Sequence, residues 1–361
     1  MVDILHSYVC TSAAAVKGLT PYLDSLISKS LYWPNTLSTA QRTFGVLPSL
    51  LGSLPYGDYG FLHLKEAMPK HETIMTRLKE NGYRSYYFYG GDRKFQEMDA
   101  FVKRNQFDVV LSDAFSDPKT PKSEYNDWGY HDDVLFRKSI EAISDSDWNA
   151  PRLDFYLTLS MHEPLNFNGY ENYYKKIDRL IEQAQGRYKD ILIAGKKYFA
   201  GLNYTDNAIR SLMKMYSNKP GYENTIFIIT GDHSTDYIPQ KSFLHKYHIP
   251  LIIYSPLLKK PEVFNAINSH WDIVPSLLAY LRDNYGIVNK DQSAFLGDGL
   301  DVSKEFRNIH DIPFMLNSRV VTEYLSKDLF VNDNKLYSLN SNMTLTPKNN
   351  ADEANKLINR R

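Results

Sequence analysis

Polar residues suited to metal binding and nucleophilic chemistry follow apolar segments at four places in the chain. The clearest is Asp232-His233, which comes after a glycine at the end of the apolar run 225–229. A short apolar run closed by a turn is typical of a buried strand in a parallel sheet, and open α/β sheets bind ligands just outside the carboxyl ends of their strands. A carboxylate beside an imidazole suits a divalent cation such as Zn²⁺ or Mn²⁺. The dipeptide alone is equally compatible with an Asp that caps a turn and a His without a ligand.

The other three places are Asp3, the pair Arg42-Thr43 and His162. Each has an ordinary structural explanation when taken alone. A Thr at the start of a helix is most often an N-cap, a lone His is more often packed than catalytic, and Asp3 can be a solvated terminal carboxylate. Because the carboxyl ends of parallel strands meet at one edge of a sheet, all four places are nevertheless expected to open on the same edge.

Taken together, these residues predict a metal-assisted transfer site. Two Asp, one His and a hydroxyl can complete a divalent metal site, and the metal would lower the pKa of the bound Thr43 hydroxyl. A helix that begins at Thr43 favours negative charge beside its N-terminus, and Arg42 can grip phosphate or sulfate oxygens. The set therefore indicates phosphoryl or sulfuryl transfer through a covalent Thr intermediate.

The composition excludes several other classes of protein. Lys+Arg and Asp+Glu both count 42 in 361 residues, so the chain lacks the basic excess of a nucleic-acid-binding protein. Cys10 is the only cysteine, which excludes an intrachain disulfide and a cysteine-based metal cage. No apolar run approaches the roughly 18 residues of a membrane helix, and no signal peptide opens the chain.

The elements that must position these residues alternate along the chain. Hydrophobic periodicity and turn signals predict helices over 22–31, 43–51, 71–81, 131–143, 171–216 and 272–281, and strands over 84–89, 107–111, 154–159, 225–230 and 249–254. Such alternation indicates an α/β fold with a mainly parallel central sheet. From about residue 297 the pattern changes to short strands with turns. We therefore expect a catalytic domain over 1–296 and a small α+β subdomain over 297–361.

Many segments, in order and at matching spacing, make the chain resemble a known family. It is similar to the soluble catalytic domain of the lipoteichoic acid synthase family, within the alkaline phosphatase and sulfatase superfamily, over roughly residues 1–300. The segments are MVDIL, GLTPYLDSL, STAQRTFGVLPSLLGSLP, YGGDRKFQEMDAF, WGYHDDVLF, LTLSMHEPL, NYTDNAI, ITGDHS, HIPLIIYSP and WDIVPSLLAYL. This resemblance implies an alkaline phosphatase/sulfatase-like α/β sandwich.

The resemblance also implies a role for each candidate residue. One divalent ion, Mn²⁺ by expectation with Zn²⁺ and Mg²⁺ as alternatives, is held by four residues. These metal ligands are Asp3, Thr43, Asp232 and His233. Thr43 is also the nucleophile, and His162 contacts the substrate and takes part in catalysis. The remaining substrate-binding residues are Arg42 and the Gly91-Asp92 turn.

Several positions depart from the family pattern. Asp3 replaces the usual Glu, and the first strand lacks its upstream half, which is expected to continue in a longer, membrane-anchored form of the protein. A Trp and an Arg hold phosphoglycerol in lipoteichoic acid synthases proper, whereas Gln96 and Met98 stand near those places here. The form of this segment is nearer to the branch that transfers phosphoglycerol to periplasmic glucans. The sulfatase hallmark C-x-P-x-R is missing, since Cys10 lies in CTSAA.

The expected function is transfer of a phosphoglycerol-type group from a phospholipid headgroup donor to a glycan or glycerol hydroxyl, through a phosphothreonine. The expected location is the periplasmic or extracellular face of a bacterial membrane. Two alternatives stay open at this point. The first is a sulfatase or phosphodiesterase of the same superfamily, and the second is a degenerate, non-catalytic binding domain.

Overall fold

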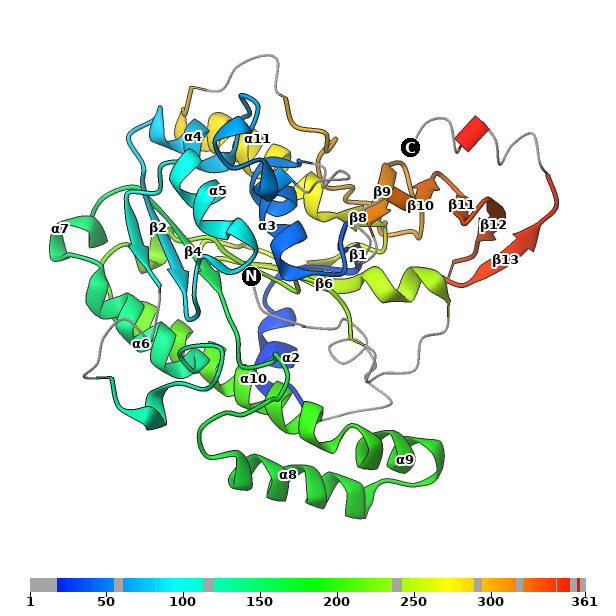
Figure 1. The fold of residues 1–361 in the computed structure, drawn as a ribbon, viewed down its shortest axis with the longest axis horizontal. Coiled ribbons are helices and arrows are strands. Elements are labelled where there is room, and N and C mark those ends of the chain that lie inside the picture. The colour runs from blue at the N-terminus through cyan, green and yellow to red at the C-terminus, as the bar shows by residue number, and fades with distance from the viewer. Residues whose placement is uncertain are drawn as a thin grey trace.

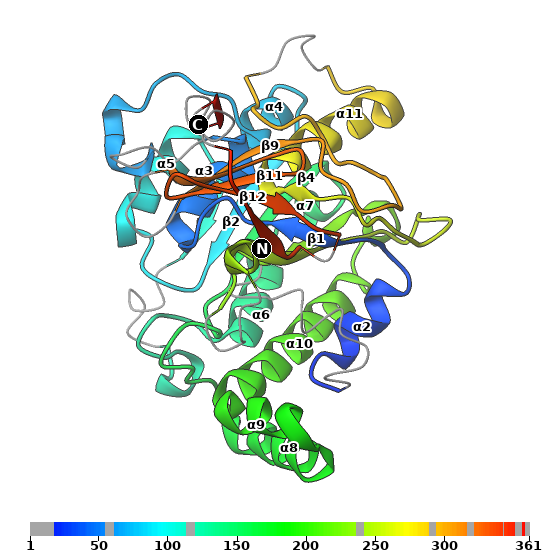
Figure 2. The same cartoon turned by 90° about the vertical axis from the view of Figure 1, so that its right-hand side faces the viewer.

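The computed structural model describes most of the chain, and its elements form two helical layers around β-sheets (Figure 1). The described residues are 18–54, 61–112, 120–235, 242–288, 294–315, 321–341, 343–350 and 356–357. Helices α3, α4, α5 and α11 lie on one side of the sheets, while α2, α6, α8, α9 and α10 lie on the other, as Figures 1 and 2 show. This layered arrangement confirms the expected α/β class.

The α-helices have the following bounds: α2 Pro21–Ile27, α3 Thr43–Gly52, α4 Ile74–Lys79, α5 Met98–Arg104, α6 Asp132–Ala142, α7 Asp145–Trp148, α8 Tyr170–Gln183, α9 Gly186–Ala194, α10 Lys196–Tyr216 and α11 Ile273–Tyr285. Short 3₁₀ helices are η1 Phe61–Ala67, η2 Phe95–Glu97, η4 Lys122–Glu124, η5 Tyr222–Asn224, η6 Phe243–Tyr247 and η7 His270–Asp272. Over the described ranges, no helix is long and apolar enough to cross a membrane.

One sheet is wholly parallel and has the strand order β3-β2-β4. Its strands are β2 Arg84–Tyr89, β3 Val109–Leu111 and β4 Arg152–Leu157. Side chains along β2 alternate between the two helical layers, because successive residues of a strand point to opposite faces. Tyr86 and Phe88 belong to the buried cluster on the α10 side, whereas Tyr87 and Tyr89 belong to the cluster on the α3 side. Both faces of this sheet are therefore buried, as expected for parallel strands.

A second sheet is mixed and has the order β5-β6-β1-β7, with β8 also paired to β1. Its strands are β1 Leu31–Leu37, β5 Phe227–Thr230, β6 His248–Tyr254, β7 Glu262–Val263 and β8 Asn268–Ser269. The parallel pairing expected for β5 is not what the sheet shows, since β6 runs antiparallel to both β5 and β1. Only β7 and β8 run parallel to β1.

The strand β1 corrects the expectation of a helix over 22–31. The helix ends at Ile27, and Leu31 already pairs with Ile253 in β6. The sequence did not suggest a strand because Pro34 and Asn35 interrupt it. The ladder between β1 and β6 shifts its register between Trp33 and Thr36, so Pro34 lies in an irregularity where no ladder hydrogen bond is lost.

The carboxyl-terminal part forms an antiparallel sheet of order β13-β12-β11-β10-β9 (Figure 2). Its strands are β9 Asp311–Met315, β10 Val321–Ser326, β11 Leu329–Asn332, β12 Lys335–Leu339 and β13 Leu345–Lys348. These hairpins confirm the short antiparallel strands expected there. The end of β9 contacts the segment before α3, because the Met315 N–H donates to the Thr39 carbonyl over 3.0 Å. The sheet thus supports the loop that leads to Thr43.

Candidate functional site

Thr43 is the first residue of α3 and is not its N-cap. The N-cap is Arg42, which has extended backbone angles (φ −143°, ψ 136°) and no capping side-chain hydrogen bond. The Thr43 hydroxyl instead donates to Asp232 Oδ2 over 2.6 Å, across 189 positions of sequence. The capping explanation for this Thr is therefore wrong, and its hydroxyl faces the carboxylate that follows β5.

Asp232 and His233 form a tight turn after β5. The Asp232 side chain is fully buried, and its Oδ1 accepts the His233 backbone N–H over 2.7 Å. The His233 Nδ1 lies 2.8 Å from the Ser234 carbonyl. Because a carbonyl can only accept, this nitrogen carries the proton and Nε2 presents a lone pair. That Nε2 lies 3.4 Å from Asp232 Oδ2.

These three side chains fit a divalent metal. Ligand atoms at about 2.0–2.1 Å from a tetrahedral Zn²⁺ lie about 3.3 Å apart, close to the 3.4 Å between His233 Nε2 and Asp232 Oδ2. The Thr43 hydroxyl approaches the same carboxylate oxygen. Asp3, the fourth predicted ligand, lies outside the described residues. Within the described ranges, no group of three or more His, Cys, Asp or Glu side chains gathers as a metal site, so the described part supplies one carboxylate, one imidazole and one hydroxyl.

Hydrogen bonds from two other segments, the one that contains Ser38 and helix η7, hold the Asp232-His233 turn in place. Ser38 Oγ donates to the Asp232 carbonyl over 2.5 Å. His270, a fully buried residue of η7, lies with its Nε2 2.9 Å from the Gly231 carbonyl and donates to it. Burial lowers the pKa of His270 to about 4, which keeps the ring neutral near neutral pH. Two residues that sequence reasoning did not single out therefore fix the turn.

His162 lies after β4 and is oriented by its own loop and by Trp128. Its Nδ1 lies 2.8 Å from the Glu163 carbonyl, which therefore accepts the Nδ1 proton and leaves the Nε2 lone pair free. Trp128 Nε1 donates to the same carbonyl over 2.5 Å. The two ring centroids are 4.0 Å apart. The imidazole is thus half-buried against an indole, with one nitrogen available.

Asp132, at the start of α6, fastens the turn that carries His162. Its buried carboxylate accepts the N–H groups of Leu159 and Ser160 over 3.0 and 3.1 Å, and the Thr205 hydroxyl over 3.3 Å. Burial raises the pKa of Asp132 above its usual value, which these hydrogen bonds partly oppose. This carboxylate binds the protein's own backbone, so its role in the described structure is to position the turn.

The Gly91-Asp92 turn follows β2 and packs against the segment of Trp128. A Cβ atom on Gly91 would lie 2.6 Å from the Trp128 carbonyl oxygen, so only glycine allows this approach. Asp92 is exposed, and its Oδ1 accepts the Lys94 N–H over 2.8 Å. Arg42 is also exposed and has no ion-pair partner among the carboxylates of the described ranges.

The predicted site residues fall into two groups in the structure. Thr43, Asp232 and His233 meet directly, while His162 and the Gly91-Asp92 turn gather around a second centre. Trp128 at that second centre was not among the predicted residues, although it stands in a segment of the family resemblance. Its only sequence signal was an aromatic residue before a glycine. Asp132 and His270 gave no local signal, because their roles depend on contacts between distant segments.

Comparisons with known proteins find one family model and several relatives. The family model "Sulfatase" matches residues 12–283. "Phosphoglycerol transferase I" from Escherichia fergusonii is 22% identical over 61% of this chain and 28% of its own. "Lipoteichoic acid synthase-like YvgJ" from Bacillus subtilis is 23% identical over 89% of this chain and 52% of its own. The chain thus spans about half or less of the length of these relatives.

Solved structures show the same fold. A protein of the alkaline phosphatase superfamily from Vibrio parahaemolyticus superposes with a TM-score of 0.74 at 18% identity, covering 99% of this chain and 82% of its own. The lipoteichoic acid synthase LtaP from Listeria monocytogenes gives a TM-score of 0.72 at 17% identity, covering 99% and 88%. At these identities the superpositions establish the architecture alone.

Proposed function

Because the chain belongs to the sulfatase family, we propose that it transfers a phosphoglycerol-type group from a phospholipid to a hydroxyl acceptor through a phosphothreonine at Thr43. The transferred group and the transfer chemistry follow the names of the phosphoglycerol transferase and lipoteichoic acid synthase-like relatives, and the phospholipid donor is part of the proposal itself. The acceptor class is a glycan or glycerol hydroxyl. The proposed location is the outer face of a bacterial membrane, with the chain anchored in its full-length form.

One observation carries the proposal. The Thr43 hydroxyl donates to Asp232 Oδ2 over 2.6 Å, and it does so from the first position of a helix. The N–H groups of a first helical turn have no partners within the helix, so they favour an anionic ligand beside this hydroxyl. A nucleophile, a carboxylate that receives its proton and an anion-favouring helix end therefore coincide. A Thr with a purely structural role would be expected to cap the helix, which this Thr does not do.

The chain's own residues can perform the two transfers in sequence. Thr43 Oγ1 forms a bond to phosphorus while the bond from phosphorus to the lipid alcohol breaks, and the Thr43 proton moves toward Asp232. Arg42 is placed beside the nucleophile to neutralise phosphoryl oxygens. Protonated His162 gives a proton to the departing alcohol. Its free Nε2 then takes the proton of the acceptor hydroxyl, which attacks phosphorus. The bond from phosphorus to Thr43 Oγ1 breaks, and the proton held at Asp232 returns to Thr43.

The proposed site includes one divalent ion, with Mn²⁺ as the expected metal and Zn²⁺ or Mg²⁺ as alternatives. Asp232, His233 and Thr43 would hold it together with Asp3. When bound, such an ion lowers the pKa of a coordinated hydroxyl and offsets negative charge on the phosphoryl group. The superfamily as a whole supports a metal requirement.

Substitutions of Thr43 test the proposal. Thr43→Ala should abolish release of diacylglycerol from phosphatidylglycerol in the presence of Mn²⁺, a loss on the order of 10⁴-fold or more, because no nucleophile remains. Thr43→Ser should keep part of the activity. The matched control is Thr73→Ala at the N-cap of α4, where the Thr side chain does accept from the Thr76 N–H. That change should cost roughly 1 kcal/mol of stability and leave turnover intact.

Other outcomes would favour the alternatives. If Thr43→Ala turns over phosphatidylglycerol as fast as the parent, the covalent mechanism is wrong. If the parent hydrolyses nitrophenyl sulfate or a nitrophenyl phosphodiester and has no transferase activity, the chain is a hydrolase of the same superfamily. If it acts on no phosphate or sulfate ester, it is a binding domain.

A further inference from the structure

Helices α8 and α9 form a hairpin that projects from the rest of the molecule, at its lower end in Figures 1 and 2. The hairpin packs on the amino-terminal half of α10. Ile177 of α8 is fully buried, and the Tyr173 ring meets the Tyr204 ring of α10 edge-on at 5.5 Å. The Lys176 ammonium also donates to Asn203 Oδ1 over 3.2 Å. The hairpin is therefore attached to α10 by one face, and much of its opposite face is exposed.

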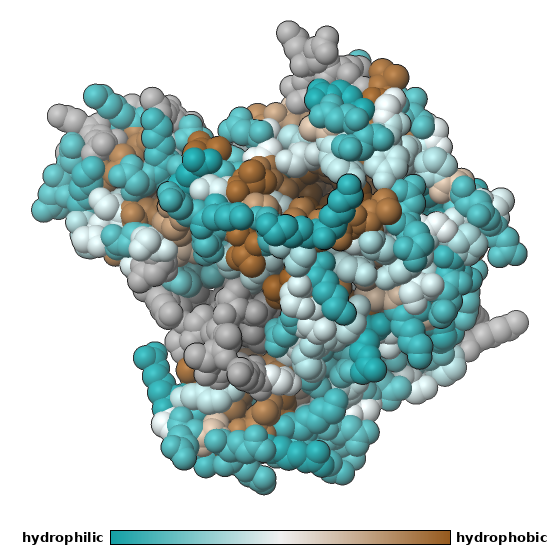
Figure 3. Space-filling view, turned by 180° about the vertical axis from the view of Figure 1, so that it is seen from behind, coloured by the Kyte–Doolittle hydropathy of each residue, from teal (hydrophilic) through white to brown (hydrophobic). Residues whose placement is uncertain are grey.

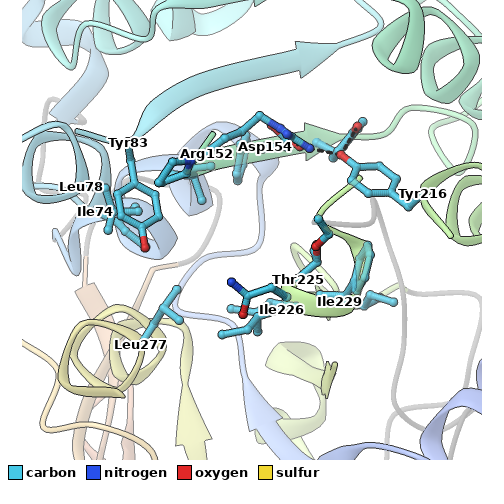
Figure 4. A pocket seen from close by; sticks show the side chains of 18 of the residues that line it. Ile74, Leu78, Tyr83, Arg152, Asp154, Tyr216, Thr225, Ile226, Ile229 and Leu277 are labelled. Carbon is cyan, nitrogen blue, oxygen red and sulfur yellow. Dashed lines mark hydrogen bonds and ion pairs between the residues drawn. The ribbon is translucent and has the colours of Figure 1, made fainter. Parts of the chain in front are cut away.

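Helix α10 holds the hairpin firmly, because the far end of this helix is fixed to the parallel sheet. The Tyr216 hydroxyl, at the end of α10, donates to Asp154 Oδ2 of β4 over 2.6 Å (Figure 4). The Tyr216 ring also packs edge-on against Trp148 at 5.4 Å. Between its ends α10 runs for 21 residues, a length of about 31 Å. The hairpin is thus the outer end of a long, anchored helix.

The base of the hairpin adjoins the centre that contains His162. A Cβ atom on Gly201 of α10 would lie 3.1 Å from Met161 Sδ and 3.4 Å from a ring carbon of Phe167. The loop on both sides of His162 therefore rests directly on α10. The same loop leads into α8, which begins at Tyr170. A surface bound by the hairpin would consequently lie beside the centre that contains His162.

The hairpin is positively charged within a chain of zero net charge. Residues 170–197 contain seven Lys or Arg and four Asp or Glu, so this segment carries a net charge of +3 and the rest of the chain carries −3. One of these cations is paired with a carboxylate, since Lys196 Nζ lies 2.6 Å from Asp178 Oδ1. Five others are exposed and have no carboxylate partner in the part of the chain that the structure describes: Lys175, Arg179, Arg187, Lys189 and Lys197. This unpaired charge favours an anionic partner.

Two large apolar or aromatic side chains are exposed among these charges. Tyr170 at the start of α8 is 49% exposed, and Ile193 near the end of α9 is 54% exposed. Seen from behind, this end of the molecule is largely hydrophilic, with a small group of apolar side chains (Figure 3). Helices that lie on a membrane surface combine basic residues with apolar and aromatic ones, and Tyr rings favour the level of the lipid headgroups. A purely polar anionic partner would not use the apolar residues, so a lipid surface fits this combination best.

We propose that the α8–α9 hairpin docks on an anionic phospholipid surface and thereby holds the His162 centre beside the membrane. The docking needs only the charges and the apolar side chains of the hairpin, whereas the membrane as the source of the donor lipid rests on the proposed function. Anionic headgroups attract each Lys or Arg that comes near the surface, and this attraction decays within a Debye length of about 8 Å at physiological ionic strength. The docking is therefore reversible and sensitive to salt.

Co-sedimentation of the full chain with lipid vesicles tests the docking. The parent should bind vesicles that contain phosphatidylglycerol and should not bind vesicles of phosphatidylcholine alone. Lys175→Glu together with Arg179→Glu should weaken the binding by about tenfold or more. The matched control is Lys259→Glu with Lys335→Glu, two exposed lysines outside the hairpin, which changes the net charge equally and should keep the binding within about twofold. Equal weakening by the two pairs, or no preference of the parent for phosphatidylglycerol vesicles, would overturn the proposal.

Steady-state kinetics distinguish a failure of this inference from a failure of the proposed function. With phosphatidylglycerol in vesicles, Lys175→Glu with Arg179→Glu should raise KM by about tenfold and keep kcat within about twofold. With a short-chain phosphatidylglycerol that is monomeric in solution, parent and variant should have the same kcat and KM, because no lipid surface is involved. An equal loss on the monomeric donor would show that these charges act on the site itself and would overturn the docking. If the parent binds the vesicles as expected and turns over neither donor, the docking is supported and the proposed function is wrong.

Discussion

Trp128 should control the orientation of His162, and substitutions can separate its two interactions. Its indole Nε1 donates to the Glu163 carbonyl that also accepts from His162 Nδ1, and its ring lies 4.0 Å from the imidazole. Trp128→Phe keeps an aromatic ring and removes the N–H donor. Trp128→Ala removes both.

The expected losses follow from these two contacts. A hydrogen bond of this kind contributes about 0.5–1.5 kcal/mol, and an aromatic pair contributes about 0.5–1.5 kcal/mol beyond its buried area. If this free energy serves to hold His162, Trp128→Phe should lower kcat by about 2- to 13-fold and Trp128→Ala by about 5- to 150-fold. KM should change little, because the group that moves is the one that transfers protons.

Steady-state kinetics with phosphatidylglycerol and Mn²⁺, together with urea unfolding, provide the measurement. Phe95→Leu is the matched control, because the Phe95 ring packs edge-on against Trp128 at 5.9 Å and is itself exposed. It should change kcat by less than about threefold. If Trp128→Ala keeps kcat within a factor of about two of the parent, the orientation of His162 does not depend on this indole. An effect confined to the unfolding midpoint would likewise refute the argument.

Three further predictions concern the metal, its supporting histidine and a buried carboxylate. Mn²⁺ at about 100 times its Kd should stabilise the parent by about 2.7 kcal/mol, seen as a higher Tm that EDTA reverses, and should not stabilise Asp232→Ala. His270→Leu should weaken Mn²⁺ binding in calorimetry by about 10- to 100-fold, because the Gly231 carbonyl loses its donor, whereas His270→Gln should keep most of the affinity. Asp206 accepts two N–H groups at the start of α2, and burial raises its pKa to about 6, well above the ordinary value of an Asp. The folded state therefore holds this proton more tightly, so its contribution to stability is full below about pH 4 and is lost as pH rises through about 6. Relative to Asp206→Asn, the parent should gain up to about 3 kcal/mol in urea unfolding between pH 7 and pH 4, and a constant difference would contradict the assignment.

The sequence predicted correctly those strands whose apolar and aromatic side chains indicate by themselves that the segment is buried. The run Arg84–Tyr89 has aromatic residues on both faces, and it forms β2 with both faces buried. β1 was missed because Pro34 and Asn35 break the pattern at a shift in register that only the pairing with β6 makes acceptable. The direction of pairing was also beyond the sequence. The residues of β5 are apolar whichever way β6 runs, so their composition predicts burial and not the sense of the ladder.

The candidate site likewise contains residues that the local sequence marks and residues whose roles depend on contacts between distant segments. Thr43, Asp232 and His233 were predictable because each one stands at the end of an element that the sequence marks. Asp132 and His270 were not, because each acts on a backbone group that is distant in sequence: Asp132 on the turn before His162, and His270 on the Gly231 carbonyl. A carboxylate at a helix start and a histidine after a short strand can have many structural roles. Only the contacts in the folded protein show which role each residue has.

The same contacts decide between the two interpretations of Thr43. A capping Thr satisfies a backbone N–H of its own helix, so its hydroxyl would be committed to structure. In this chain Arg42 takes the N-cap position with extended backbone angles, and its side chain makes no capping hydrogen bond. The helix therefore forgoes the stability of a capping side chain, about 1 kcal/mol, at the one end where the hydroxyl meets Asp232. A helix N-terminus without a capping side chain, beside a hydroxyl that faces Asp232, suits an anionic ester substrate, because helix N-termini favour negative charge.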